Sequence, residues 1–372
     1  MLVVGAGAIG LMAAWRLALA GYRVSVVDPA LALEPGQRTP SGSQAALGVL
    51  MANVFQRSTG RSWRLRQRSH ALWGQWLAEL EGRGHPLKRQ QGLLLLAASR
   101  EELERQERLA ADRARLGLPL GLLGPDQLAA LSPALPATPL GGLYSADDGQ
   151  IDPGPLLNAL LEEVRRSGCD WGAEAAVAVE RGPASGGRRW RVRMAGGGER
   201  EAHWLVLALG LETAGLLSGL GHPLQLEPVL GQALELELPA GVPWSWPAVV
   251  VWRGMNLVNC GEQADGSRRL WLGATLEPGC RACPQALAAL RQLGDEAPPW
   301  LREARVVRQW QGLRVRPVGQ PAPVLAEPEP GLLVATGHYR NGVLLAPATA
   351  EWLVARVQGA AVLQQAHLKR LA

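Results

Sequence analysis

One feature near the N-terminus constrains the fold more than any other, a short apolar run that leads into a glycine-rich turn. The run ends at Val3-Val4, and the turn reads Gly5-Ala6-Gly7-Ala8-Ile9-Gly10. Helical apolar spacing follows over 9–20, and a second apolar run over 24–28 ends on an acid, Asp28. This order of strand, turn, helix, strand and acid predicts the first βαβ unit of a dinucleotide-binding domain.

Each glycine of the turn has an expected role. Gly5 allows the tight turn, Gly7 lets the backbone approach a pyrophosphate, and Gly10 lets helix and strand pack closely. Asp28 stands where a carboxylate can accept hydrogen bonds from ribose hydroxyls. The alternative is a glycine-rich turn without a ligand, and the flanking strand, helix and acid favour the ligand.

Composition narrows the class of protein. At 372 residues the chain exceeds what one hydrophobic core normally supports, so two domains or one interrupted domain are expected. No stretch approaches the ~20 uninterrupted apolar residues of a membrane helix, and no leader is visible, so we expect a cytoplasmic protein that does not bind a membrane. The net charge of +5 comes from arginines scattered among acids, which argues against a nucleic-acid partner.

The four cysteines are expected to be reduced, because nothing indicates secretion. Cys280 and Cys283 form a C-x-x-C pair. No second pair or histidine cluster completes a zinc site, so no metal is expected.

Periodicity predicts an α/β chain with a strand-rich second half. The Asp152-Pro153 step is a good helix start, with an acid at the N-cap and proline at the first helical position. The run 224–276 favours a long antiparallel sheet. Helices are expected at 9–20, 62–80, 100–116, after Pro153 and in a final segment holding Trp352 and Val357, and strands at 24–28, 92–97, 175–180, 190–194, 204–210, 226–236, 248–252, 256–260, 270–274 and 332–336.

Two late stretches each place an arginine beside glycine, Gly312-Leu313-Arg314 and Gly337-His338-Tyr339-Arg340. A guanidinium matches a carboxylate through two parallel hydrogen bonds, so Arg314 and Arg340 suggest a small acid as substrate. For either arginine the alternative is an internal ion pair. The small residues of Ser43 to Leu50 leave room for a flat ring against the backbone, although they are equally consistent with close helix packing.

The order of these parts resembles the D-amino acid oxidase superfamily of FAD-dependent oxidoreductases, and most closely its glycine oxidase branch. The most specific match is the segment Gly337 to Pro347. The other matching segments span nearly the whole chain and are Gly5 to Gly10 with Asp28, Ser43 to Leu50, Asp148 to Pro153, Leu207 to Gly210, Gly273 to Thr275, and Gly312 to Arg314.

The resemblance implies noncovalent FAD, an interrupted Rossmann-like α/β FAD-binding domain and an α+β substrate domain built on an antiparallel sheet. By this reasoning residues 1–85, 147–216 and 310–372 form the FAD-binding domain. Residues 86–146 and 217–309 form the substrate-binding domain.

Carried over residue by residue, the resemblance assigns Arg314 and Arg340 to the substrate carboxylate. Asn256 stands where relatives carry a tyrosine that holds the substrate, and Leu230 replaces a basic residue. No catalytic side chain is implied, because the flavin carries the chemistry. The positions expected to contact FAD are Gly5, Gly7, Ala8, Ile9, Gly10, Asp28, Pro29, Ser43, Leu47, Gly48, Val49, Ala176, His338, Tyr339, Arg340, Asn341, Gly342, Val343 and Leu344.

The implied activity is oxidative deamination of a small amino acid, glycine first and then sarcosine or small D-amino acids. Hydride would pass to the flavin and electrons to oxygen, giving an imine or glyoxylate, ammonia and hydrogen peroxide. The family further implies a role in thiazole and thiamin biosynthesis and thiazole synthase as a partner. Whether the chain forms a homo-oligomer is left open by the sequence. The alternatives are a D-amino acid or sarcosine dehydrogenase with another electron acceptor, a nicotinamide enzyme, and a flavin-binding subunit without turnover.

Overall fold

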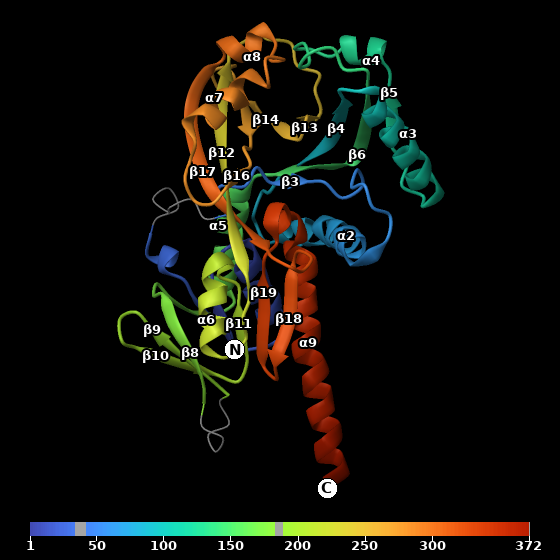
Figure 1. Cartoon of the computed structure of the whole chain (residues 1–372). Coiled ribbons are helices and arrows are strands. Elements are labelled where there is room, and N and C mark those ends of the chain that lie inside the picture. Colours follow the sequence, from blue (N-terminus) through green and yellow to red (C-terminus); the bar gives the residue numbers. More distant parts are fainter. Residues whose placement is uncertain (34–41, 183–188, 372) are drawn as a thin grey trace.

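A computed structural model describes residues 1–33, 42–182 and 189–371, with side chains up to residue 359. Two large sheets dominate it (Figure 1). Residues 34–43 are rich in proline, glycine, serine and threonine, which predicts a surface loop, and residues 34–41 of this segment lie outside the described residues. No helix among the described residues is long and apolar enough to cross a membrane.

The first sheet has six strands in the order β18-β19-β11-β1-β2-β7. Its centre is parallel, with β1 between β2 and β11, and β18 is added antiparallel at one edge. Segments far apart in the sequence therefore meet in one layer. The bounds are β1 Leu2–Val4, β2 Ser25–Val27, β7 Asp170–Gly172, β11 Leu205–Leu207, β18 Val324–Glu329 and β19 Leu332–Thr336.

Helix α1 (Ala8–Leu19) packs closely against this sheet and is apolar on nearly all sides. Trp15 and Leu11 are fully buried in the same core as the neighbouring helices. A helix that is apolar all round needs partners on every side. These are α5 (Pro153–Arg166), α9 (Gly342–Leu371) and α2 (Gly60–Gly82), which contacts α1 through the rings of Trp76 and Trp15. Helix α9 extends well beyond the sheets in Figure 1.

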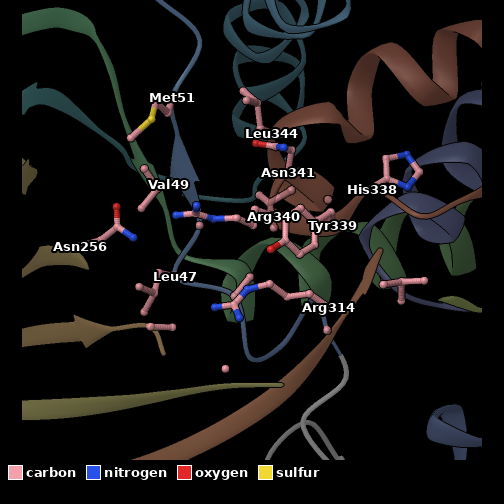
Figure 2. Close-up of a pocket in the computed structure, with 18 of the residues that line it drawn as sticks. Leu47, Val49, Met51, Asn256, Arg314, His338, Tyr339, Arg340, Asn341 and Leu344 are labelled. Atoms are coloured by element: carbon pink, nitrogen blue, oxygen red, sulfur yellow. The ribbon is translucent and has the colours of Figure 1, made fainter. Parts of the chain in front are cut away.

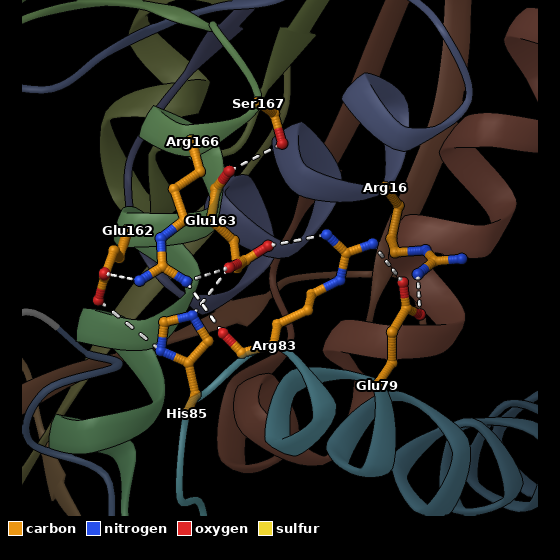
Figure 3. A network of polar contacts seen from close by, with 8 residues as sticks. All are labelled: Arg16, Glu79, Arg83, His85, Glu162, Glu163, Arg166 and Ser167. Atoms are coloured by element: carbon orange, nitrogen blue, oxygen red, sulfur yellow. Dashed lines mark hydrogen bonds and ion pairs between the residues drawn. The ribbon is translucent and has the colours of Figure 1, made fainter.

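A polar network ties the end of α2 to α5 (Figure 3). The buried Glu163 carboxylate accepts hydrogen bonds from His85 Nε2 at 2.8 Å, Arg166 Nη1 at 3.2 Å and Arg83 Nη1 at 3.3 Å. A buried carboxylate is tolerated only when its oxygens are paired in this way. The network therefore fixes how the two helices meet.

The second sheet has ten strands on its main path or branching from it, and carries the other large core. Most pairings are antiparallel, while β4 and β13 run parallel with Val249 opposite Leu93. The long pairing of β12 with β17 forms one side. The bounds are β3 Val49–Leu50, β4 Arg89–Ala97, β5 Gly121–Leu123, β6 Gly141–Ile151, β12 Leu226–Leu238, β13 Val249–Trp252, β14 Met255–Glu262, β15 Arg268–Gly273, β16 Glu277–Pro278 and β17 Arg305–Pro317.

Smaller elements complete the chain. A three-stranded antiparallel sheet packs near the parallel sheet, and three short 3-10 turns join larger elements. The remaining bounds are β8 Ala176–Arg181, β9 Trp190–Met194, β10 Glu199–Ala202, η1 Pro29–Ala32, η2 Gly210–Glu212, η3 Tyr339–Asn341, α3 Arg100–Arg115, α4 Pro125–Ala129, α6 Thr213–Gly219, α7 Pro284–Gln292 and α8 Pro299–Glu303.

The α/β class and the long, mostly antiparallel second sheet agree with the prediction. Strands β6 and β17 were not predicted, because acids, glycines and arginines interrupt their apolar patterns. The division into two domains stays a prediction. Strands β3 and β17 pair in the ten-stranded sheet, although the prediction gives Val49–Leu50 and most of β17 to the FAD-binding part.

Candidate active site

A cavity of about 1490 Å³ runs between the two sheets. At one end it reaches Gly7 and Asp28, and at the other Asn256 and Arg314. A cavity of this volume is large enough for a sizeable cofactor and a small molecule together.

The glycine-rich turn lies at one end of the cavity. Gly5 has φ +108°, which favours glycine, and a side chain at Gly10 would overlap the carbonyl oxygen of Gly5. The turn and the start of α1 can therefore lie this close only because both positions are glycine. The N-terminal amides of α1 point toward this end and would stabilise a phosphate.

The Asp28 carboxylate fastens this turn. Oδ2 accepts a hydrogen bond from the Ala6 amide at 2.7 Å, and Oδ1 accepts one from the Ala30 amide at 2.8 Å. Each carboxylate oxygen keeps a second lone pair, so Asp28 can still accept from a ribose hydroxyl. The side chain thus has a structural role that was not expected from the sequence.

The small-residue segment after 42 lies between the turn and strand β17. Ser43 Oγ accepts from the Ala8 amide at 3.0 Å, and Trp310 Nε1 donates to the Ala45 carbonyl at 3.1 Å. Leu47, Gly48 and Val49 continue along the cavity wall. The segment therefore links the phosphate-binding end to the strand that carries Arg314.

Arg314 projects from β17 into the cavity without meeting a carboxylate. Its Nη1 donates to the Thr275 carbonyl at 3.0 Å and the Leu230 carbonyl at 3.3 Å. Burial lowers the pKa of Arg314, and the neighbouring Arg340 lowers it further. The guanidinium keeps donors for an anionic ligand.

Arg340 leaves η3 and faces the same space as Arg314, with Tyr339 between them (Figure 2). Its side chain is exposed to the cavity, and the described residues give it no hydrogen bond or ion pair. The backbone at Tyr339 has φ +53°, a conformation that is uncommon outside glycine and turns the chain sharply there. Two cations without an acid partner thus face one space.

A polar cluster lies behind Arg314. The buried Glu277 carboxylate accepts hydrogen bonds from Gln232 Nε2 at 2.9 Å and from the Cys283 amide at 2.6 Å. It also accepts one from the Thr275 hydroxyl. Burial raises the pKa of Glu277, but these hydrogen bonds outweigh it and leave the pKa below its usual range. A charged acid therefore lies near Arg314 without an ion pair between them.

Arg66 is another arginine on the cavity wall, and its position there was not predicted from the sequence. It comes from the buried face of α2, donates to the Met51 carbonyl at 2.9 Å and lies over the ring of Phe55 at 4.0 Å. Burial lowers its pKa to about 10, although the nearby Asp148 opposes this change. An arginine on an otherwise apolar helix face was the sequence signal that could have revealed it.

Asp148 is fully buried and holds the segment that carries Met51. Its carboxylate accepts from the amides of Ala52 at 2.8 Å, Asn53 at 3.0 Å and Val54 at 3.0 Å. Three amides on one carboxylate fix this stretch of backbone. Asp148 therefore supports the part of the cavity wall formed by Met51 and Val54, although it does not line the cavity itself.

His338 lies at the cavity wall, but its ring turns away from the arginines (Figure 2). It is buried, and Nε2 shares a hydrogen bond with Thr349 Oγ1 at 3.0 Å. Burial lowers the pKa of His338 to about 3, so the ring is neutral at ordinary pH. Only its backbone is positioned to meet a ligand.

Most residues predicted for the site line this one cavity. Asn256 is among them, and its Nδ2 donates to the Gly273 carbonyl at 3.2 Å. Five predicted residues in the described part of the chain do not line it: Gly5, Ala8, Gly10, Pro29 and Ala176. Gly5 and Gly10 contact each other instead. The lining residues among those predicted are Gly7, Ile9, Asp28, Ser43, Leu47, Gly48, Val49, Asn256, Arg314, His338, Tyr339, Arg340, Asn341, Gly342, Val343 and Leu344.

Comparison with known proteins gives consistent matches over almost the whole chain. The family model described as DAO, FAD dependent oxidoreductase, matches residues 1–356. Glycine oxidase of Geobacillus kaustophilus is 30% identical over 355 residues, which cover 93% of this chain and 89% of that protein. The bifunctional protein ThiO/ThiG of Synechocystis sp. is 28% identical over 353 residues, or 94% of this chain and 50% of that longer protein.

The solved structures agree. The crystal structure of glycine oxidase from Geobacillus kaustophilus superposes with a TM-score of 0.83 at 26% identity, covering 96% of this chain and 94% of that one. The similarity therefore includes both sheets.

Proposed function

Because the chain belongs to the DAO family of FAD-dependent oxidoreductases, we propose that it oxidises the amine of a small amino acid, with glycine preferred. Sarcosine and small D-amino acids are the next substrates. The proposal draws on the similarity to glycine oxidases and on the charges of the cavity.

The residues around the turn fit FAD. The close approach of Gly5 and Gly10 leaves no room for side chains, and the α1 amides and the Asp28 carboxylate suit a pyrophosphate and a ribose. Leu47 to Val49 would lie along the ring system. Bound there without a covalent link, the flavin supplies an acceptor for the hydride of the substrate.

One observation carries the choice of substrate. Arg314 and Arg340 face the same space and have no carboxylate partner within the described chain. Unpaired guanidinium groups that face one cavity favour a ligand that brings a carboxylate. A small amino acid satisfies this need and leaves its α-carbon free to face the flavin.

The chain's own residues would act mainly by orientation. Arg314 and Arg340 would hold the carboxylate, which places the α-carbon about 3–3.5 Å from the accepting atom. The amides that follow Gly337 would stabilise negative charge that develops on the flavin ring. No strong base is required if the neutral amine is the reacting form.

Loss of the hydride and of an amine proton would leave an imine that hydrolyses to glyoxylate and ammonia. Oxygen would then accept two electrons and two protons, giving hydrogen peroxide. Similarity to the bifunctional ThiO/ThiG proteins supports a link to thiazole synthesis. We therefore propose thiazole synthase as a consumer of the imine.

The proposal is tested by adding amino acids to the purified yellow protein without oxygen. Glycine should bleach the flavin absorbance, sarcosine should follow, and L-amino acids should have little effect. Admission of oxygen should restore the colour with one equivalent of hydrogen peroxide. Bleaching without recovery in oxygen would indicate a dehydrogenase, and no bleaching by any amino acid would contradict the proposal.

A further inference from the structure

The C-x-x-C pair is not used by the proposed chemistry, yet it adjoins the cavity. Cys280 is one of the lining residues, and the thiols of Cys280 and Cys283 are both exposed. The described residues bring no group of three or more histidines, cysteines or acids together as metal ligands. The pair is therefore available for chemistry between its own two sulfur atoms.

The segment between the cysteines is held at both ends. Before it, the Gly279 amide donates to the Pro228 carbonyl at 3.0 Å, and the Gly279 carbonyl accepts from the Leu230 amide at 3.2 Å. After it, the Cys283 amide donates to Glu277 at 2.6 Å. Both attachments lie beside the residues that contact Arg314.

Between these attachments the backbone is free to adjust. Cys280, Arg281 and Ala282 make no backbone hydrogen bond within the described chain and are exposed to solvent. A disulfide needs the two Cα atoms about 4.4–6.8 Å apart, which a three-residue step reaches only when it turns. An unbonded segment can make that turn without breaking the fold.

We propose that Cys280 and Cys283 form a redox-active dithiol that hydrogen peroxide oxidises to a disulfide. The proposal rests on the proposed function only for the source of peroxide, which would leave the flavin through the cavity that Cys280 lines. The site itself rests on the exposed pair and its free segment.

The reaction balances in two steps. One thiolate attacks peroxide, the O–O bond breaks, and a sulfenic acid and hydroxide form. The hydroxide takes the proton that the first thiol lost and becomes water. The second thiol then attacks the sulfenic sulfur, the S–O bond breaks, and a second water leaves as the disulfide forms. Two thiols lose two electrons in total, and one peroxide becomes two waters.

Oxidation would affect the carboxylate site through Cys283. Its amide is bonded to Glu277 and its carbonyl accepts from Gln232 Nε2 at 2.9 Å, so closing the segment pulls on both. Glu277 also accepts from Thr275, whose carbonyl holds Arg314. The disulfide form should therefore bind the amino acid several-fold more weakly.

The test treats the intact flavoprotein with hydrogen peroxide and follows thiol number and intact mass. The wild type should lose two thiols together and a mass of two hydrogens, and dithiothreitol should restore both. Cys283→Ser should instead gain one oxygen at Cys280, trapped by a sulfenic acid reagent. Cys260→Ser is the matched control, because burial raises the pKa of that thiol and the pair remains intact.

The proposed dithiol would be contradicted if the two cysteines were oxidised independently. It would also be contradicted if both thiols stayed reduced under conditions that oxidise free glutathione. An unchanged KM for glycine in the oxidised wild type would overturn the link to Arg314, and Cys280→Ser should keep its KM after the same treatment. The test supplies hydrogen peroxide from outside, so it does not depend on turnover by the protein. Failure of the proposed function would therefore be distinguished from failure of the dithiol proposal.

Discussion

The guanidinium of Arg314 occupies the space in which a side chain at Gly231 would begin. A Cβ atom at Gly231 would lie only 2.6 Å from Cζ of Arg314. In the pairing of β12 with β17, Arg314 lies opposite Val229, so its side chain crosses diagonally over the glycine. The absence of a side chain at Gly231 on β12 thus determines where the guanidinium of Arg314 on β17 can lie.

Gly231→Ala should therefore displace Arg314 and raise the KM for glycine at least tenfold, with a smaller change in kcat. The added methyl group cannot fit beside the guanidinium, so the arginine must move. Steady-state kinetics on glycine measures the effect. Gly215→Ala is the control, because nothing lies within 4 Å of a Cβ there. Equal KM values for both variants would mean that Arg314 does not bind the substrate.

Asp28→Ala should weaken FAD binding without changing the order of substrate preference. The change removes the acceptor for the Ala6 and Ala30 amides and any acceptor for the ribose. A hydrogen bond to a charged group contributes about 1.5–3 kcal/mol, so we expect a Kd at least ten times higher. Titration of the apoprotein with FAD provides the measurement. An unchanged Kd would show that Asp28 does not contribute to FAD binding.

Asp148→Ala should lower the free energy of unfolding by about 3 kcal/mol or more. Three buried amides would lose their acceptor, and an unsatisfied buried donor costs roughly 1–3 kcal/mol. Urea denaturation of the FAD-bound protein measures the change. The exposed neighbour Asp147→Ala should change little. Similar losses in both variants would show that the carboxylate does not support this wall.

His338 should make the protein less stable in acid. Its pKa is about 3 when folded, whereas an unfolded histidine has a pKa near 6.5, so only the unfolded chain gains a proton between these values. Stability from this group is complete above about pH 6.5 and declines as the pH falls toward 3. His338→Gln should show a shallower decline in unfolding free energy between pH 7 and 4. Parallel curves for the two proteins would contradict a buried neutral ring.

The dinucleotide turn and the two arginines were predictable because residue type alone identifies their chemistry. Gly5, Gly7 and Gly10 occupy positions that few other residues can, and a guanidinium beside glycine indicates anion binding. In the structure Arg314 and Arg340 line the same cavity, and their role at the substrate carboxylate stays a prediction.

Other parts of the site could not be predicted from local patterns. Gly231 gains its role only from a diagonal neighbour on a strand more than eighty residues away. The acids of β6 disguise a strand, so the burial of Asp148 and its contacts with Ala52 to Val54 were not visible. Arg66 differs from other helical arginines only by the apolar face on which it lies. Register and packing between distant segments decide such roles.

Arg314 and Arg340 together are proposed to bind the substrate carboxylate. The most direct test is the rate of flavin reduction by glycine without oxygen, measured by stopped flow in wild type, Arg314→Lys and Arg340→Ala. Removing one partner of a buried charge pair costs roughly 2–5 kcal/mol, so both variants should lose about thirty- to several-thousand-fold in reduction efficiency while keeping the oxidised flavin spectrum. Lysine keeps the charge but lacks the planar fork, so its loss should persist. Flavin reduction by glycine at wild-type efficiency in both variants would contradict the account.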